Sequence, residues 1–189
     1  HEPFHPPSGG GSAEAVYLAR ELVGRGHELH VFSPPAADPA AVEREFGVRL
    51  HPFTRWEMGR YTRWRNVKYL LYPAFLERLV VAAAARAPFA VLLAQHAIAS
   101  VAAGRLRQRL GVPVVMNFLD HLTAFMETWP AWLMPRPLLA ALKRYELAVP
   151  ARFAADGVLA VSDPLADRLV AAGCPRERVR PLYYGYDAE

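Results

Sequence analysis

Hydrophobic residues along this chain alternate between short apolar runs and longer stretches with helical spacing. The apolar runs predict six strands, at residues 28–32, 48–52, 90–94, 113–118, 157–161 and 179–183. The helically spaced stretches predict six helices, at residues 13–23, 40–46, 64–85, 97–110, 137–154 and 164–172. Because strands and helices alternate, we expect an α/β fold, a Rossmann-like parallel sheet with helices on both faces.

Glycine and proline mark several of these element ends. Gly24 and Gly26 end the first helix, Gly111 ends the fourth, and Pro113 opens the strand that follows it. Pro181 lies inside the last predicted strand. Because proline has no N–H to donate, we expect that strand at an edge of the sheet or as a loop.

A glycine triplet, Gly9, Gly10 and Gly11, precedes the first predicted helix. Glycines leave the backbone open, so free N–H groups and the positive end of the helix can face a phosphate or a sugar. Ser12 is a candidate N-cap for this helix. The alternative is a flexible loop without a ligand. The triplet is not a dinucleotide fingerprint, because Glu14 stands where that pattern needs glycine.

Three polar residues follow predicted strands at their carboxyl ends. Asp120 and His121 come after the strand at residues 113–118, and His96 comes after the strand at residues 90–94. Open α/β sheets bind ligands at this edge, and a carboxylate beside an imidazole can orient hydroxyls or move protons. The structural alternatives are capping or solvent exposure for Asp120 and His121, and a helix N-terminal contact for His96.

Ser162 also follows a predicted strand, and it is a candidate for substrate contact. Asp163 and Pro164 come next, and a capping residue followed by proline is typical of a helix start. The residues therefore favour a structural role at a helix N-terminus, with a supporting role at the ligand site as the alternative.

Four segments together resemble one family. They are PPSGGGSA with LARELVGRGHELHVF at residues 6–32, GVPVVMNFLD at residues 111–120, DGVLAVSD at residues 156–163 and YGYD at residues 184–187. In this order they are similar to the N-terminal domain of the retaining GT-B glycosyltransferases of family 4. The resemblance implies transfer of a sugar from a nucleotide-diphosphate donor to a hydroxyl of a sugar or lipid-linked acceptor, with retained configuration.

The resemblance also implies a domain organisation. Residues 1–183 would form the acceptor-side Rossmann-like domain, and residues 184–189 would begin the interdomain linker. The family's first strand and its C-terminal donor-binding domain would lie outside this chain. We therefore expect the chain to need that second domain as a partner, and to be inactive alone.

The family's site residues carry over unevenly. Asp120 matches the family's aspartate, but the histidine that many members place just before it is Leu119 here. His121 is a neighbour that could replace this histidine. Ser162 corresponds to a serine near the family's interdomain cleft, and Tyr184 replaces the usual asparagine of the hinge.

Composition and charge limit the number of domains, the cellular compartment and the class of binding partner that we expect. The chain has 189 residues, of which 53% are hydrophobic, enough for one core. Cys174 is the single cysteine, which excludes an intrachain disulfide and fits the cytoplasm. No apolar run is long enough to span a bilayer. The net charge of +4 favours anionic partners such as nucleotide diphosphates, lipid phosphates or an anionic membrane surface.

One stretch, from Arg55 to Tyr72, alternates basic and aromatic residues. This pattern suits peripheral contact with anionic lipid at the inner face of the membrane, or with a lipid-linked acceptor. It would also suit stacking on nucleic acid, which we consider the weaker alternative. The structural alternative is a long helix, kinked at Pro73, with a solvated face and core aromatics.

Metal and cofactor signals are weak. His1, Glu2 and His5 spell the zinc pattern H-E-x-x-H, but the prolines around them prevent the helix that it requires. No D-x-D triplet occurs, so we expect no metal, and no cofactor besides the donor.

The alternative to a glycosyltransferase is a non-catalytic α/β domain that binds a phosphorylated ligand. A second domain with paired glutamates in the full-length protein would favour the enzyme.

Overall fold

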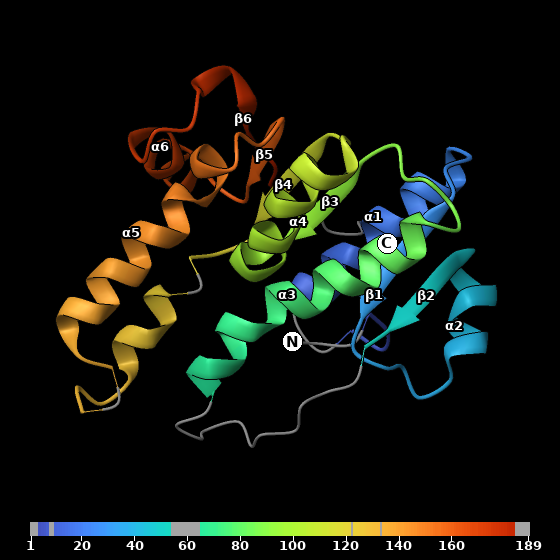
Figure 1. The fold of residues 1–189 in the computed structure, drawn as a ribbon, viewed down its shortest axis with the longest axis horizontal. Coiled ribbons are helices and arrows are strands. Elements are labelled where there is room, and N and C mark those ends of the chain that lie inside the picture. Colours follow the sequence, from blue (N-terminus) through green and yellow to red (C-terminus); the bar gives the residue numbers. More distant parts are fainter. Residues whose placement is uncertain (1–3, 8–9, 54–64, 122, 133, 184–189) are drawn as a thin grey trace. The chain divides into compact units, whose positions relative to one another are not determined.

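The computed structural model describes residues 4–7, 10–53, 65–121, 123–132 and 134–183. It divides the chain into two compact units, His1–Arg60 and Tyr61–Glu189. Each unit contains its own parallel sheet flanked by helices (Figure 1). The α/β class and the parallel pairing predicted from the sequence are therefore confirmed, with the described strands in two sheets.

The first unit is built from α1 (Gly10–Gly24), β1 (Leu29–Ser33), α2 (Pro39–Phe46) and β2 (Val48–Pro52). Strands β1 and β2 pair in parallel, with Leu29 opposite Val48. Buried side chains from both helices, from β2 and from the segment before α1 form its core, namely Phe4, Val16, Ala19, Val42, Phe46 and Val48. Asp38 caps α2 by accepting a hydrogen bond from the N–H of Ala41 at 3.0 Å.

The second unit contains α3 (Arg65–Ala84), β3 (Leu92–Gln95), α4 (His96–Leu110), β4 (Val114–Phe118), η1 (Ala124–Thr128), α5 (Arg136–Arg152), β5 (Gly157–Ala160), α6 (Asp163–Ala171), η2 (Arg176–Arg178) and β6 (Val179–Pro181). Its four strands lie in the order β3-β4-β5-β6, and all pairs are parallel. Helix α4 packs on β3 and β4, while α6 packs on β5 and β6 (Figure 1).

Strand β4 is the centre of the second core. Val114, Met116 and Phe118 are almost completely buried, because β4 has a strand on each side and helix α4 packed against it. Gly104 on α4 permits the close approach of Phe153, since a Cβ at this position would lie 2.3 Å from the Phe153 ring. The absence of a side chain at Gly104 therefore lets α4 pack closely on Phe153, the residue after α5.

The structure confirms the order and type of the predicted strands and helices, and β6 with its Pro181 lies at a sheet edge as expected. The start of the first helix was predicted wrongly. Gly10 and Gly11 belong to α1, so Ser12 is its third residue and not its N-cap. Glycine disfavours helix interiors, but Ser12 and Val16 are buried, and this packing holds the first turn. The short helices η1 and η2 were not predicted.

Candidate active site

The predicted site residues of the second unit lie at the carboxyl edge of its sheet. Strands β3 and β4 are parallel and in register, with Gln95 opposite Asn117. His96 directly follows β3 and begins α4, while Asp120 follows β4 by two residues. The shared register therefore brings two residues that are 24 positions apart in the sequence to one place.

His96 and Asp120 face each other. The Nδ1 atom of His96 lies 3.6 Å from Oδ1 of Asp120. This distance exceeds that of a direct hydrogen bond, and Nδ1 has no hydrogen-bond partner among the described residues. The side chain of Asp120 is 62% exposed. Both groups therefore keep hydrogen-bonding capacity for a third molecule, such as an acceptor hydroxyl.

The backbone at His96 is strained. Its φ of 62° is in the left-handed region, which residues with a Cβ rarely adopt. The carbonyl oxygen of His96 accepts a hydrogen bond from the Ser100 hydroxyl at 2.8 Å, which supports this conformation from inside α4. Strain of this kind is concentrated at functional sites, where the surrounding structure compensates for it.

His121 has a different neighbour from Asp120. Its side chain is 11% exposed, and its Nε2 atom lies 3.6 Å from Oε2 of Glu146. Glu146 is buried within α5 and accepts two hydrogen bonds from Thr123, from the backbone N–H at 2.8 Å and from the hydroxyl at 2.5 Å. Glu146 thus anchors the loop that carries Asp120. The structure does not bring His121 into the His96–Asp120 pair.

Sequence reasoning missed Glu146. A signal was present, because Glu146 shares a helical face with the buried residues Val149 and Pro150. A carboxylate on a buried face must have polar partners, since burying an unpaired charge is costly. A charged residue at such a position therefore indicates a structural or functional polar cluster.

Ser162 lies at the same edge, after β5. It occupies the N-cap position of α6 with an extended backbone, but its side chain makes no capping hydrogen bond. The neighbouring Asp163 accepts a hydrogen bond from the Tyr183 hydroxyl at 2.5 Å. The helix start predicted for this segment is present, with Ser162 at the N-cap position, but the Ser162 hydroxyl makes no bond to the helix N-terminus.

At the opposite, amino edge of the same sheet lies an aspartate whose carboxylate is hydrogen-bonded within the protein. Asp156 precedes β5 and accepts two hydrogen bonds from the Arg107 guanidinium, each at 2.8 Å. It also accepts one from the N–H of Val114 at 2.9 Å. The bonds from Arg107 hold the pKa of Asp156 well below its usual range. This arrangement ties α4 to the starts of β4 and β5.

The remaining predicted functional residues lie away from this sheet edge or outside the described residues. Gly10 and Gly11 lie in the first turn of α1 in the first unit, while Gly9, His1 and Glu2 lie outside the described residues. Residues 55–64, most of the basic and aromatic stretch, also lie outside them, as does the motif at residues 184–187. Tyr72 is buried within α3, as expected for a core aromatic.

Two absences hold for the described part of the chain. None of its helices combines the length and hydropathy needed to cross a membrane. Within the same residues, no three His, Cys, Asp or Glu side chains gather in a group suited to a metal ion.

Solved structures show the same fold. The chain is similar to HepE (Alr3699) of Anabaena in complex with UDP and glucose, with 17% identity, a TM-score of 0.60 and coverage of 96% of this chain and 42% of that one. It is also similar to LpCGTa in complex with UDP, with 15% identity, a TM-score of 0.58 and coverage of 97% and 52%. It is similar as well to the glycotransferase of kitacinnamycin, with 18% identity, a TM-score of 0.58 and coverage of 92% of this chain and 49% of that one.

The chain thus spans about half the length of the solved structures it matches. No curated protein matches it. The model of the family named Glycosyltransferase Family 4 matches residues 8–189, nearly the whole chain. On this match, and with a fold shared with known glycosyltransferases, the chain belongs to Glycosyltransferase Family 4.

Proposed function

We propose that the chain is the N-terminal, acceptor-side half of a retaining GT-B glycosyltransferase. It would move a sugar from a nucleotide-diphosphate donor to an acceptor hydroxyl. Family membership supports glycosyl transfer, and two of the three similar structures described above contain UDP. In this proposal residues 1–183 form the domain, residues 184–189 begin the linker, and a donor-binding domain outside this chain completes the enzyme.

The observation that carries the proposal is the His96–Asp120 pair at the carboxyl edge of the second sheet. The Asp120 carboxylate can accept a hydrogen bond from the acceptor hydroxyl and orient its oxygen toward the anomeric carbon. In the reaction a new bond forms between that oxygen and the anomeric carbon, and the bond from this carbon to the diphosphate breaks. As the new bond forms, the hydroxyl proton passes along its hydrogen bond to the Asp120 carboxylate, and the imidazole of His96 beside it can hold this carboxyl group in place.

Other residues have supporting roles in this proposal. Gly10 and Gly11 form the first turn of α1, where free N–H groups and the helix dipole favour a phosphate of the donor. Ser162 can hydrogen-bond a sugar hydroxyl, because its own hydroxyl does not cap α6. His121 and Glu146 hold the loop that carries Asp120.

One edge of the second sheet is formed by β3. Strand β3 pairs with β4 on one side, and no described strand pairs with its other side. Leu93 on β3 is 40% exposed, which is unusual for a residue of a parallel strand. We propose that the family's first strand pairs with this edge of β3.

We also propose where the enzyme acts in the cell and that its reaction needs no metal ion. The positive charge of the chain supports an anionic partner. We propose a cytoplasmic enzyme with peripheral contact at the inner face of the membrane through residues 55–72. We further propose a reaction without a metal ion, in which case chelation by EDTA leaves the rate of sugar transfer unchanged.

The test is a transfer assay with the full-length protein. A panel of nucleotide sugars is incubated with sugar and lipid-linked acceptors, and release of the nucleotide diphosphate and formation of glycosylated product are both measured. We expect one donor to give product with retained anomeric configuration, and the chain alone to give none. Binding of a nucleotide sugar without release or transfer would instead support a non-catalytic domain that recognises a phosphorylated ligand.

A further inference from the structure

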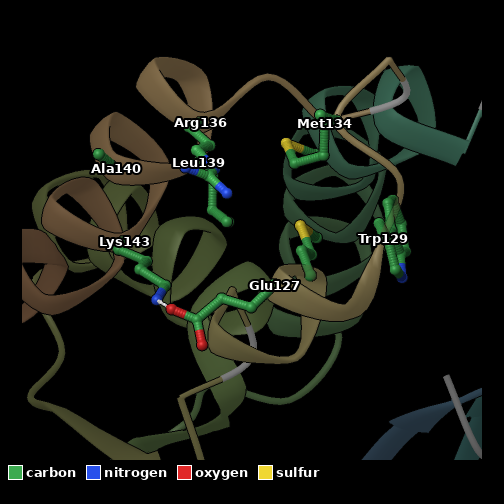
Figure 2. Close-up of a pocket in the computed structure, with 9 residues that line it drawn as sticks. Glu127, Trp129, Met134, Arg136, Leu139, Ala140 and Lys143 are labelled. Atoms are coloured by element: carbon green, nitrogen blue, oxygen red, sulfur yellow. Dashed lines mark hydrogen bonds and ion pairs between the residues drawn. The ribbon is translucent and has the colours of Figure 1, made fainter.

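A cavity of about 490 Å³ lies between η1, the segment after it and the first turns of α5. None of its lining residues belongs to the His96–Asp120 pair. Its volume falls within the range of small-molecule sites, roughly 300–1,000 Å³. Figure 2 shows Met134 on one side of the space and Arg136 with Leu139 on the other. The cavity is therefore large enough to take part of a ligand.

The walls of the cavity combine apolar and charged side chains. Six of its nine lining residues are apolar, namely Met126, Trp129, Ala131, Met134, Leu139 and Ala140. Methionine side chains are flexible and polarisable, so they adapt to ligands of irregular shape. Neighbouring apolar side chains are exposed: Trp132, which follows the lining residue Ala131, is 74% exposed. These features favour an apolar ligand portion over a sugar.

The charges at the cavity do not cancel. Glu127 and Lys143 line it and form an ion pair with each other (Figure 2). Arg136 also lines it and has no ion pair among the described residues. Arg136 is the first residue of α5, where the helix dipole disfavours a cation, so helix stability does not explain this residue. The excess positive charge complements an anion, and the Arg136 guanidinium suits a phosphate.

We infer that this cavity binds a lipid phosphate, with its hydrocarbon chain between Met134 and Leu139 and its phosphate on Arg136. The inference rests on the proposed function, because the lipid phosphate would be part of a lipid-linked acceptor. It goes beyond that function in assigning the acceptor class and its anchoring residues. Apolar lining and an unpaired cation occur together here, which is the combination that a single-chain anionic amphiphile requires.

Binding is measured directly, by isothermal titration calorimetry of the full-length protein with dodecyl phosphate below its micelle concentration. Dodecyl maltoside serves as the neutral probe and dodecanoate as the carboxylate probe. We expect saturable binding of dodecyl phosphate, with weaker binding of both other probes. A folded protein that does not bind dodecyl phosphate, or that binds the neutral probe equally well, would overturn the assignment.

Variants at two positions and one control locate the site. Arg136→Gln should weaken binding of dodecyl phosphate about tenfold, because a charge-assisted hydrogen bond is lost. Arg144→Gln is the control, since Arg144 is an exposed cation of the same helix that does not line the cavity. Ala140→Trp places a large ring into the cavity from an exposed position and should abolish binding; Ala140→Leu, a milder filling, should weaken it if the tryptophan variant misfolds.

The outcomes separate this inference from the proposed function. Equal weakening by Arg136→Gln and Arg144→Gln would indicate non-specific attraction and overturn the inference, as would unchanged binding by folded cavity-filling variants. Sugar transfer by a protein that does not bind dodecyl phosphate would overturn the inference alone. Specific binding that depends on Arg136, in a protein without transfer activity, would support the cavity assignment and contradict the proposed enzyme.

Discussion

The two edges of the β3–β6 sheet each carry an aspartate, and the two carboxylates have opposite surroundings. At the amino edge, Asp156 accepts hydrogen bonds from Arg107 and from the N–H of Val114, all at 2.8–2.9 Å. At the carboxyl edge, the one ion-pair partner of Asp120 among the described residues is the imidazole of His96, at 3.6 Å. The carboxylate of Asp156 therefore accepts its hydrogen bonds from the protein, whereas the carboxylate of Asp120 can still accept hydrogen bonds from a ligand.

This difference separates a structural acid from a candidate functional acid. The hydrogen bonds of Asp156 join three elements of the second unit, so its loss should affect folding. Asp120 is mostly exposed, beside a histidine with strained backbone, and contributes few contacts to the fold. Its loss should affect ligands and catalysis. The predictions below test this division, beginning with the largest effect.

The largest expected effect is on catalysis. Asp120→Asn keeps the shape of the side chain but removes the charge that orients the acceptor hydroxyl. In the full-length protein, kcat/KM for sugar transfer should fall at least about tenfold, while Tm stays unchanged. Steady-state kinetics and a thermal melt measure both quantities. Normal turnover with a lowered Tm would assign Asp120 a capping role and break the comparison.

The matched variant at the other edge should show the reverse pattern. Asp156→Asn removes the charged acceptor of Arg107, and we expect a loss of about 1 kcal/mol in the free energy of unfolding, since solvent screens this partly exposed pair. Urea denaturation measures the loss. The rate of transfer should change by less than about twofold. A large loss of activity in a variant of near-normal stability would contradict a structural role.

The acid sensitivity of the fold sharpens the same contrast. The pKa of Asp156 is lowered in the folded state, so its contribution to stability is complete above its unfolded pKa, about 4, and is lost as the pH falls below this value toward the folded pKa. The stability gap between the natural protein and Asp156→Asn should therefore shrink from pH 5 toward about pH 2. Urea unfolding at several pH values tests this. A gap that is independent of pH would show that the charge of Asp156 is not the cause.

The smallest expected effect is at Ser162. A serine that caps a helix with its side chain contributes about 1 kcal/mol, but the hydroxyl of Ser162 makes no such bond. Ser162→Ala should therefore lower stability by less than about 0.5 kcal/mol, and any clear effect should be on KM. A loss near 1 kcal/mol with unchanged kinetics would make Ser162 a structural residue like Asp156.

The sequence predicts the α/β fold well because its signals are local and periodic. The range 48–52 was predicted for the strand that the structure shows as Val48–Pro52, and strand ends already place Asp120 and His96 at one edge. The pairing of these two side chains depends on the register of β3 and β4, which periodicity does not determine. The anchoring of the loop by Glu146 and the cavity beside η1 depend on tertiary packing. Prolines and aromatics around η1 give no helical period, so this element could not be predicted.

The most direct test of the account is a crystal structure of the full-length protein with UDP or another bound nucleotide diphosphate and the acceptor identified by the transfer assay. We predict the acceptor hydroxyl within hydrogen-bonding distance of the Asp120 carboxylate, beside His96 at the carboxyl edge of the β3–β6 sheet. An acceptor bound elsewhere, with Asp120 facing only solvent, would contradict the account. Binding near Arg107 and Asp156 at the amino edge would reverse the roles of the two aspartates.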